Sequence, residues 1–196
     1  MVCKDHLVHH HREFHDFREA QPDLADNDRC IFLNLNAPIH LITRMMAGLK
    51  SRPEAMIVNV TSGLALAPRS GGPVYCASKA GLIAYLQSLR AELRPTPLTV
   101  HTISPGYLRT ALTAGNTFAM PGLLEPDAAA RALLQGVAQG REHIVLPRRI
   151  GWLSKALSLL PAKLHDRILL GQPRKPRAGQ VGATPIPGLN HPSHKP

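Results

Sequence analysis

Residues 56–63 read MIVNVTSG, residues 73–79 read PVYCASK and residues 98–106 read LTVHTISPG. The first and third segments are β-branched runs that end at glycine, a pattern typical of buried strands. The middle segment opens on proline and keeps apolar residues at three- and four-residue steps, which predicts a helix over 74–93 that Pro95 ends. Two buried strands joined by a long helix indicate a parallel α/β unit.

The flanking segments continue this alternation of helix and strand. Apolar residues recur at helical steps over 30–49, with Pro38 inside that helix. A third helix is predicted over 125–138 with Gly140 as its stop, and residues 143–146 (HIVL) are a third strand candidate. The order helix, strand, helix, strand, helix, strand is typical of an α/β fold with a parallel sheet.

The composition of the chain excludes several classes of protein. Of its 196 residues, 44% are hydrophobic and 18% are charged, which favours one globular domain over a disulfide scaffold or a wholly disordered chain. No apolar run reaches about 18 residues and the start has no apolar signal-peptide core, so neither a membrane span nor secretion is expected. The three cysteines follow no metal-binding or redox spacing, which favours a reducing, cytoplasmic setting.

The two ends of the chain differ in composition from the middle. Residues 1–28 hold five histidines and seven acids without an apolar period, and we expect them to be poorly ordered and to bind no metal. Residues 29–170 form the predicted domain, and the proline-rich residues 171–196 predict a disordered basic tail. Residues 141–196 carry 10 Lys and Arg against 2 Asp and Glu, which we interpret as a solvated surface rather than a nucleic-acid site.

The clearest chemical signal is a tyrosine and a lysine one helical turn apart. Tyr75 and Lys79 share one face of the predicted helix, with Cβ atoms about 5 to 6 Å apart. The unperturbed pKa of tyrosine is about 10, and an adjacent ammonium lowers that pKa, so the pair suits proton transfer. Ser62 directly follows the first strand, and parallel sheets bind ligands outside the carboxyl ends of their strands. Its hydroxyl is therefore expected to hold a substrate oxygen.

Two further features point to the same edge of the sheet. Pro105 and Gly106 end the second strand, where a glycine lets a flat ligand approach the backbone closely. Pro38 has no N–H to offer, so the carbonyl of Asn34 loses its helical partner and the helix is expected to kink. A free carbonyl can hold a water, although an ordinary capping or turn asparagine explains Asn34 equally well.

Together these segments resemble the short-chain dehydrogenases/reductases. The resemblance rests on Asn34 in LNLNAP, NVTSG at 59–63, YCASK at 75–79 and PGYLRT at 105–110, in that order. It implies a Rossmann-like, doubly wound parallel sheet. It also implies an oxidoreductase that uses NAD or NADP and moves a hydride between the nicotinamide and a small carbonyl or alcohol substrate.

The resemblance implies a role for each matched residue. Tyr75 would be the acid/base, Ser62 would orient the carbonyl or alcohol, and Lys79 would lower the pKa of Tyr75 and bind the nicotinamide ribose. Asn34 would anchor a relay water. The residues implied around the nicotinamide and its carboxamide, besides Tyr75 and Lys79, are Pro105, Gly106, Leu108 and Thr110.

The resemblance covers about residues 28–147 and lacks the first segments of the family. Its members hold the pyrophosphate on a glycine-rich TGxxxGxG turn after their first strand, whereas no glycine precedes Gly48 here. The NNAG segment expected ahead of Asn34 is absent too. The sequence therefore resembles the C-terminal half of such an enzyme, without on the order of 80 to 90 residues that form the first three strands. We expect weak dinucleotide binding, and neither NAD nor NADP is favoured.

A second function stays open, namely a catalytically inactive fragment that serves as an interaction or membrane-surface module. Residues 150–170 predict two short helices split at Pro161, and their apolar stripe around Trp152 favours cover over the sheet. Beside Arg149 and Lys155, the same stripe is the candidate membrane-surface face.

Self-association is also expected. The predicted helices over 30–49 and 74–93 carry apolar stripes, and in the family the corresponding helices form a subunit interface, which implies a homo-oligomer. The strand over 56–61 would pair on its outer side with a strand that this sequence lacks, so its open edge offers a second route to association.

Overall fold

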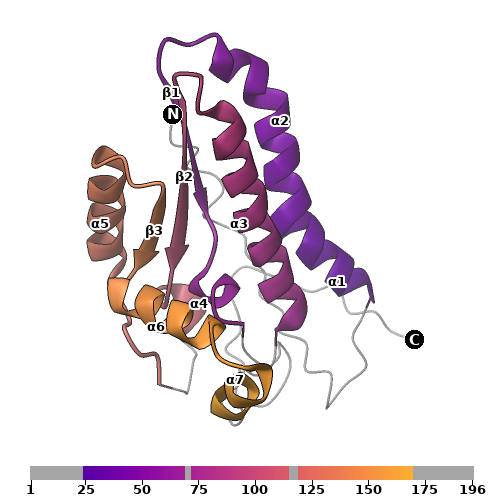
Figure 1. Ribbon diagram of the computed structural model, residues 1–196, viewed down its shortest axis with the longest axis vertical. Helices are drawn as coiled ribbons and strands as arrows, with labels where there is room; N and C mark the ends of the chain where they lie inside the picture. The colour runs from indigo at the N-terminus through magenta and orange to yellow at the C-terminus, as the bar shows by residue number, and fades with distance from the viewer. Residues whose placement is uncertain (1–23, 69–71, 115–118, 170–196) are drawn as a thin grey trace.

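The computed structural model describes residues 24–68, 72–114 and 119–169 (Figure 1). Its sheet consists of parallel strands in the order β1, β2, β3, with the bounds β1 Ala55–Val60, β2 Leu98–Pro105 and β3 His143–Leu146. All three strands lie within one residue of their predicted bounds. β-Branched runs bounded by proline and glycine are a strong local signal, which explains this agreement.

One long helical segment precedes the sheet. Three elements follow one another without a break, namely α1 Leu24–Ile31, the π-helical turn η2 Phe32–Asn36 and α2 Ala37–Lys50. The sequence predicts a helix that starts at Cys30, whereas α1 already includes Leu24. Residues 24–28, which the composition assigns to a poorly ordered start, are therefore helical. The N–H of Ala37 bonds to the carbonyl of Phe32, five residues back, just before Pro38. The disruption expected from Pro38 therefore takes the form of a π-helical turn.

The remaining helical elements lie between and after the strands. They are the 3-10 turn η3 Gly63–Ala65, α3 Pro73–Leu93, α4 Ala111–Ala114, α5 Pro126–Ala138, α6 Arg148–Ser158 and α7 Ala162–Leu169. The predicted helices over 74–93 and 125–138 and the split at Pro161 are confirmed. Gly140, just after α5, has a φ of 68°, the left-handed conformation that favours glycine at the end of a helix.

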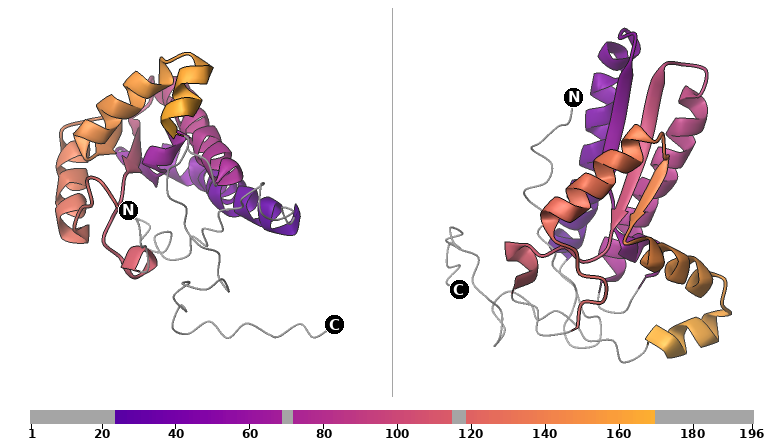
Figure 2. Two further views of the ribbon diagram at one scale, coloured as in Figure 1. Left: turned by 90° about the horizontal axis from the view of Figure 1, so that it is seen from below. Right: turned by 90° about the vertical axis from the view of Figure 1, so that its left-hand side faces the viewer.

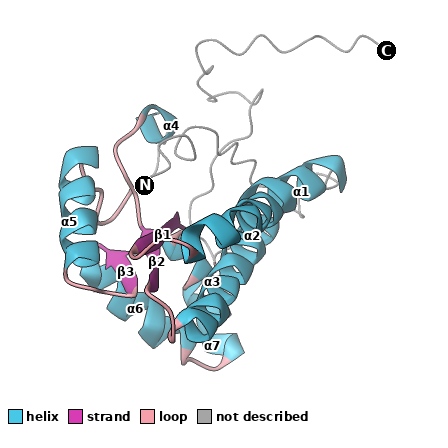
Figure 3. Ribbon diagram, turned by 90° about the horizontal axis from the view of Figure 1, so that it is seen from above, coloured by secondary structure: helices cyan, strands magenta, loops and turns pink. Residues whose placement is uncertain are grey.

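Helices cover both faces of the sheet (Figures 1 and 3). α2 and α3 lie on one face, where the fully buried Leu82 and Leu86 pack in one core cluster with Ile57 and Val100. α5 lies on the opposite face, over a second cluster formed around Ile103 on β2 and two residues of β3. The structure thus confirms the predicted fold class, a partial, doubly wound parallel α/β fold.

The predictions for the two ends of the chain concern residues that the structure does not describe. The His-rich start up to residue 23 and the basic tail from residue 170 onward lie outside the described residues. Within 24–68, 72–114 and 119–169, no group of three His, Cys, Asp or Glu side chains could hold a metal ion. No helix in those ranges has the length and hydropathy needed to cross a bilayer.

Candidate active site

The turn after β1 brings Ser62 to the carboxyl end of the sheet. Ser62 is buried and caps η3, with its Oγ accepting a hydrogen bond from the N–H of Leu64 at 3.2 Å. Gly63 lies directly against the end of β2, because a Cβ atom there would stand 3.3 Å from the carbonyl oxygen of Pro105. The ends of β1 and β2 therefore meet at one place, as the sequence predicts.

A chain of polar side chains links the ends of β1 and β2 to the first residue of β3. Thr61 Oγ1 donates to the carbonyl of Ile103 at 3.0 Å and lies 2.7 Å from Ser104 Oγ, which in turn lies 2.8 Å from His143 Nε2. Each hydroxyl has one proton, so the donors run in one direction, from His143 Nε2–H to Ser104 and from Ser104 to Thr61. We call Thr61, Ser104 and His143 the strand-end chain. It fixes the backbone immediately before Ser62.

The surroundings of His143 favour the neutral form of its imidazole. Burial lowers the pKa of His143 below its usual value, and the positive charge of Arg90 lowers the pKa further. Arg90 itself is fixed by an ion pair from its Nε to Glu142 Oε2 at 3.2 Å. The strand-end chain requires that the imidazole carries a proton on Nε2.

The strand-end chain was not evident in the sequence. Thr61, Ser104 and His143 are scattered over the chain, and hydroxyl residues at the ends of strands are common. The available signal was that Ser104 and His143 lie on neighbouring predicted strands. Only the observed register, in which Thr102 pairs with His143, places their side chains within hydrogen-bond distance.

Tyr75 and Lys79 lie one turn apart near the start of α3. Pro73 occupies the first turn of this helix, where its missing N–H costs nothing. Both side chains point inward, since Tyr75 is only 4% exposed and Lys79 only 2%. Ser78, between them in the sequence, donates its hydroxyl to the carbonyl of Tyr75 at 2.8 Å. A lysine this deeply buried is rare in soluble proteins and calls for a functional explanation.

α3 is the element that connects the other candidate residues. It contacts η3, whose first turn Ser62 caps, and it also contacts η2, which contains Asn34. The approach to η2 is close at Gly81, where a Cβ atom would stand 3.4 Å from the side chain of Leu35. The fold thus gathers the elements that carry the predicted catalytic residues around α3.

Asn34 is buried, and only the NH₂ group of its side-chain amide makes a hydrogen bond to a described residue. Its Nδ2 donates to Cys30 Sγ at 3.3 Å, whereas its Oδ1 accepts no hydrogen bond from the part of the chain that the structure describes. A buried acceptor without a partner is costly unless a small donor such as water reaches it. The position of Pro38 predicts a free backbone carbonyl at Asn34 as one candidate for holding a water, and the structure adds the side-chain oxygen as an acceptor.

Gly106 is explained by packing. Its N–H donates to the carbonyl of Leu146 at 2.6 Å, and a Cβ atom at this position would stand 3.3 Å from the same oxygen and 3.5 Å from Pro147 Cδ. The close approach of the β3 backbone is therefore a sufficient reason for glycine here. From the sequence, the close approach of a flat ligand was the expected reason for a glycine here. The packing of Gly106 against Leu146 and Pro147 was not predicted.

The loop after Gly106 is held by backbone bonds and one hydroxyl. Leu108 forms a bridge with Leu124, the residue two positions before α5. The N–H of Thr110 donates to Thr113 Oγ1 at 2.9 Å, and Thr113 donates to the carbonyl of Leu108 at 2.5 Å. Leu108 and Thr110 are thus placed in an ordered loop beyond the end of β2.

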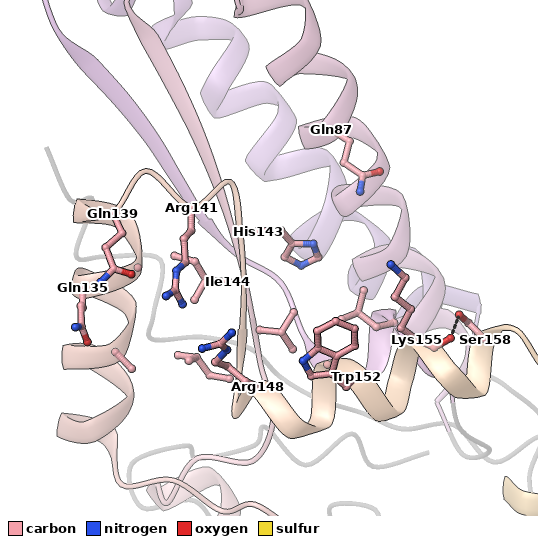
Figure 4. A pocket seen from close by; sticks show the side chains of 16 residues that line it. Gln87, Gln135, Gln139, Arg141, His143, Ile144, Arg148, Trp152, Lys155 and Ser158 are labelled. Carbon is pink, nitrogen blue, oxygen red and sulfur yellow. Dashed lines mark hydrogen bonds between the residues drawn. The ribbon is translucent and has the colours of Figure 1, made fainter.

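An open cavity of about 960 Å³ lies beside the outer edge of β3, between α5 and α6 (Figure 4). Three cations line it, namely Arg141, Arg148 and Lys155, together with Trp152 and His143. The described residues that line it include neither an acid nor any predicted catalytic residue. The cavity and the candidate active site are therefore separate features of the molecule.

Residues 11–119 match the family model of the short chain dehydrogenases, which is more than half of the chain. The chain belongs to the short-chain dehydrogenase family. The matched range contains Asn34, Ser62, Tyr75 and Lys79, and also the segment from Pro105 onward. The resemblance inferred from the sequence motifs is thereby confirmed.

Individual relatives agree with this membership. An uncharacterized oxidoreductase, DltE of Bacillus subtilis, is 41% identical over 97 residues, which are 50% of this chain and 38% of that protein. An uncharacterized oxidoreductase of Myxococcus xanthus is 29% identical over 133 residues, 68% of this chain and 53% of that protein. The chain thus spans about half the length, or less, of these curated relatives.

The fold agrees with solved structures of the family. A short chain dehydrogenase from Burkholderia cenocepacia, crystallised in complex with NADP, aligns with a TM-score of 0.68 over 80% of this chain and 64% of that chain. The two sequences are 22% identical, so this likeness concerns the fold alone. It agrees with the parallel sheet and the helices on both of its faces.

Proposed function

We propose that the chain is an NAD(P)-dependent oxidoreductase that moves a hydride between the nicotinamide and a small carbonyl or alcohol. The observation that carries the proposal is the burial of Tyr75 and Lys79, one turn apart on α3, beside the turn that Ser62 caps. Burying a tyrosine hydroxyl and a lysine costs desolvation that an apolar core would avoid, and these three residues have the chemistry of proton transfer to an oxygen.

Each residue has one task in this proposal. The phenol of Tyr75 gives a proton to the substrate oxygen during reduction and takes it back during oxidation. The hydroxyl of Ser62 donates to the same oxygen and orients it, while the strand-end chain holds the preceding backbone in place. The ammonium of Lys79 adds positive charge near the phenol and binds a ribose hydroxyl. Asn34 Oδ1 accepts a hydrogen bond from a water that connects the site to solvent.

The residues present fit one end of the cofactor. Lys79, the ordered loop with Leu108 and Thr110, and the end of β2 at Pro105 and Gly106 would hold the nicotinamide, which supplies or accepts the hydride when bound. The sequence contains no glycine-rich turn for the pyrophosphate. We therefore propose weak binding of NAD or NADP by this chain. We also propose a reducing, cytoplasmic location, because the three cysteines of the sequence follow no metal-binding or redox spacing.

The test compares two tyrosines on the same helix. Tyr75→Phe should reduce carbonyl reduction by about 10²- to 10⁴-fold, measured with a panel of small ketones at saturating NADPH or NADH, because it removes the proton donor. Tyr85→Phe, ten residues further along α3, is the matched control and should keep the wild-type rate. Equal rates for wild type and Tyr75→Phe, or an equal loss in both variants, would contradict the assignment.

We also propose a homo-oligomer in which α2, α3 and the edge of β1 take part. Phe32 in η2 and Met56 on β1 are exposed apolar side chains, and β1 is an edge strand of the described sheet. Both features favour association. Sedimentation of the purified chain at tens of micromolar should show species larger than a monomer. A single, cooperatively folded monomer would contradict this proposal.

A further inference from the structure

α6 turns two small residues toward the sheet and exposes two of its large apolar ones. Its inward side contains Gly151, where a Cβ atom would stand 3.0 Å from Val145, and the buried Ser154. On its outward side, Trp152 is 71% exposed and Leu153 is 57% exposed. Large apolar side chains are normally the ones that a helix buries against a sheet. The expectation that Trp152 covers the sheet is therefore not met.

The exposed apolar surface continues into α7. Leu159, in the connection between the two helices, is 78% exposed. Leu164 and Ile168 are also exposed and lie four residues apart, so they share one face of α7. Figures 1 and 2 show both helices at the end of the sheet where the strands terminate. We call residues 148–169 the α6–α7 surface.

The charge of the α6–α7 surface is strongly positive. It carries one acid, Asp166, and five basic residues, namely Arg148, Arg149, Lys155, Lys163 and Arg167. Figure 4 shows Trp152 between Arg148 and Lys155 along α6. A tryptophan flanked by cations on an exposed helix is the pattern of helices that lie in the interface of a bilayer.

We propose that the α6–α7 surface docks on anionic lipid bilayers. Trp152, Leu153 and the apolar face of α7 would enter the boundary between headgroups and acyl chains, while the basic side chains bind lipid phosphates. A second copy of the chain is a poorer occupant, because pairing two such surfaces would bring five cations against five. Docking is peripheral in this account and does not depend on the proposed oxidoreductase activity.

The full-length chain can report on its own docking, because Trp152 is its only tryptophan. The chain is mixed with vesicles of phosphatidylcholine alone or of phosphatidylcholine and phosphatidylglycerol in equal parts. Cosedimentation measures binding, and the emission maximum of Trp152 measures its surroundings. We expect binding and a shift to shorter wavelength only on the anionic vesicles, both weakened by added salt.

Two pairs of variants test whether vesicle binding depends on the α6–α7 surface rather than on the net charge or hydrophobicity of the whole chain. Reversing Arg148, Arg149 and Lys155 to Glu should weaken binding roughly 100-fold or more. Reversing the exposed Arg44, Lys50 and Arg52 changes the net charge equally, but elsewhere on the molecule, and should weaken binding far less.

The second pair removes apolar side chains. Trp152→Ala combined with Leu153→Ala should weaken binding by roughly ten-fold or more, because it removes the two most exposed apolar groups of α6. The matched control combines Leu24→Ala with Leu134→Ala, at exposed positions on α1 and α5, and should bind like the wild type. Circular dichroism of all four variants confirms that each is folded.

Four outcomes would overturn the proposal. The first is equal binding to both kinds of vesicle, and the second is an equal loss in the variants and their controls. The third is binding without a shift in the emission of Trp152, which would assign the contact to another basic segment. A shift that follows protein concentration in the absence of lipid would also overturn it, because a second copy would then cover α6.

Discussion

α3 and α6 depart from the usual pattern of a surface helix in opposite directions. α3 buries Tyr75, Ser78 and Lys79 together with its leucines, whereas α6 exposes Trp152 and buries Ser154. Burying polar groups costs desolvation, and leaving a tryptophan in water forgoes the stabilisation of its burial. Neither helix is optimised for stability alone. We infer that α3 is shaped by chemistry inside the fold and α6 by contact outside it.

The largest expected effect on stability concerns the apolar half of α3. Leu86 is fully buried between α3 and the sheet, so Leu86→Ala should lower the free energy of unfolding by about 2 to 5 kcal/mol. Urea denaturation followed by circular dichroism measures this. A loss below about 1 kcal/mol would mean that α3 is held in place by something other than its packing on β1 and β2.

The strand-end chain should contribute less. Ser104→Ala leaves Thr61 and His143 without their shared partner inside the fold, which should cost about 1 to 3 kcal/mol. Ser158→Ala is the matched control, because it also removes a hydrogen-bonded hydroxyl, which donates to the carbonyl of Lys155 at 2.9 Å, but in an exposed position. Equal stability of the two variants in the same urea titration would argue against a structural role for the chain.

The pH dependence of stability tests the neutral state of His143. Burial and the charge of Arg90 lower the pKa of His143 in the folded chain, so the unfolded chain binds a proton at a higher pH than the folded chain does. The free energy of unfolding should therefore fall as pH drops below about 6.5, by at most about 1.4 kcal/mol per pH unit from this residue.

His143→Gln should remove that part of the slope. His40→Gln, at an exposed position on α2, is the control and should keep the slope of the wild type. Both are measured by urea denaturation between about pH 5 and 8. A slope that is unchanged in His143→Gln would show that the acid sensitivity arises elsewhere.

The smallest expected effect lies on α6. Trp152→Ala should change the free energy of unfolding by less than about 0.5 kcal/mol, because the side chain contacts little of the fold. The measurement repeats the urea titration used for Leu86→Ala. A loss of several kcal/mol would place Trp152 in the core and remove the contrast between the two helices.

The sequence predicted the helices and strands better than it predicted which of their side chains are exposed. Strands and helices were evident because β-branched runs, Pro73, Pro95 and Gly140 are local signals that act within a few residues. The exposure of Trp152 was missed because an apolar stripe predicts an amphipathic helix but not which neighbour covers it. Gly151 and Ser154 were the available clue, since small residues let α6 lie close to β3.

The residues of the candidate site could be proposed from the sequence, but the tertiary contacts around them could not. Tyr75, Lys79 and Ser62 follow from motif and spacing, and the fold gathers their elements around α3. Contacts that depend on strand register, such as that between Ser104 and His143, involve residues 39 positions apart. The same holds for the buried oxygen of Asn34, whose missing partner is a property of tertiary packing.

The central claim is that this chain carries the nicotinamide end of a dehydrogenase site. Saturation-transfer NMR on NAD and NADP mixed with the full-length chain tests it directly, because the method detects weak binding and distinguishes the two ends of the dinucleotide. We predict that the nicotinamide protons receive the strongest saturation, that the adenine protons receive little, and that Lys79→Met abolishes the effect. Saturation that is strongest on the adenine, or no transfer to either dinucleotide, would contradict the account.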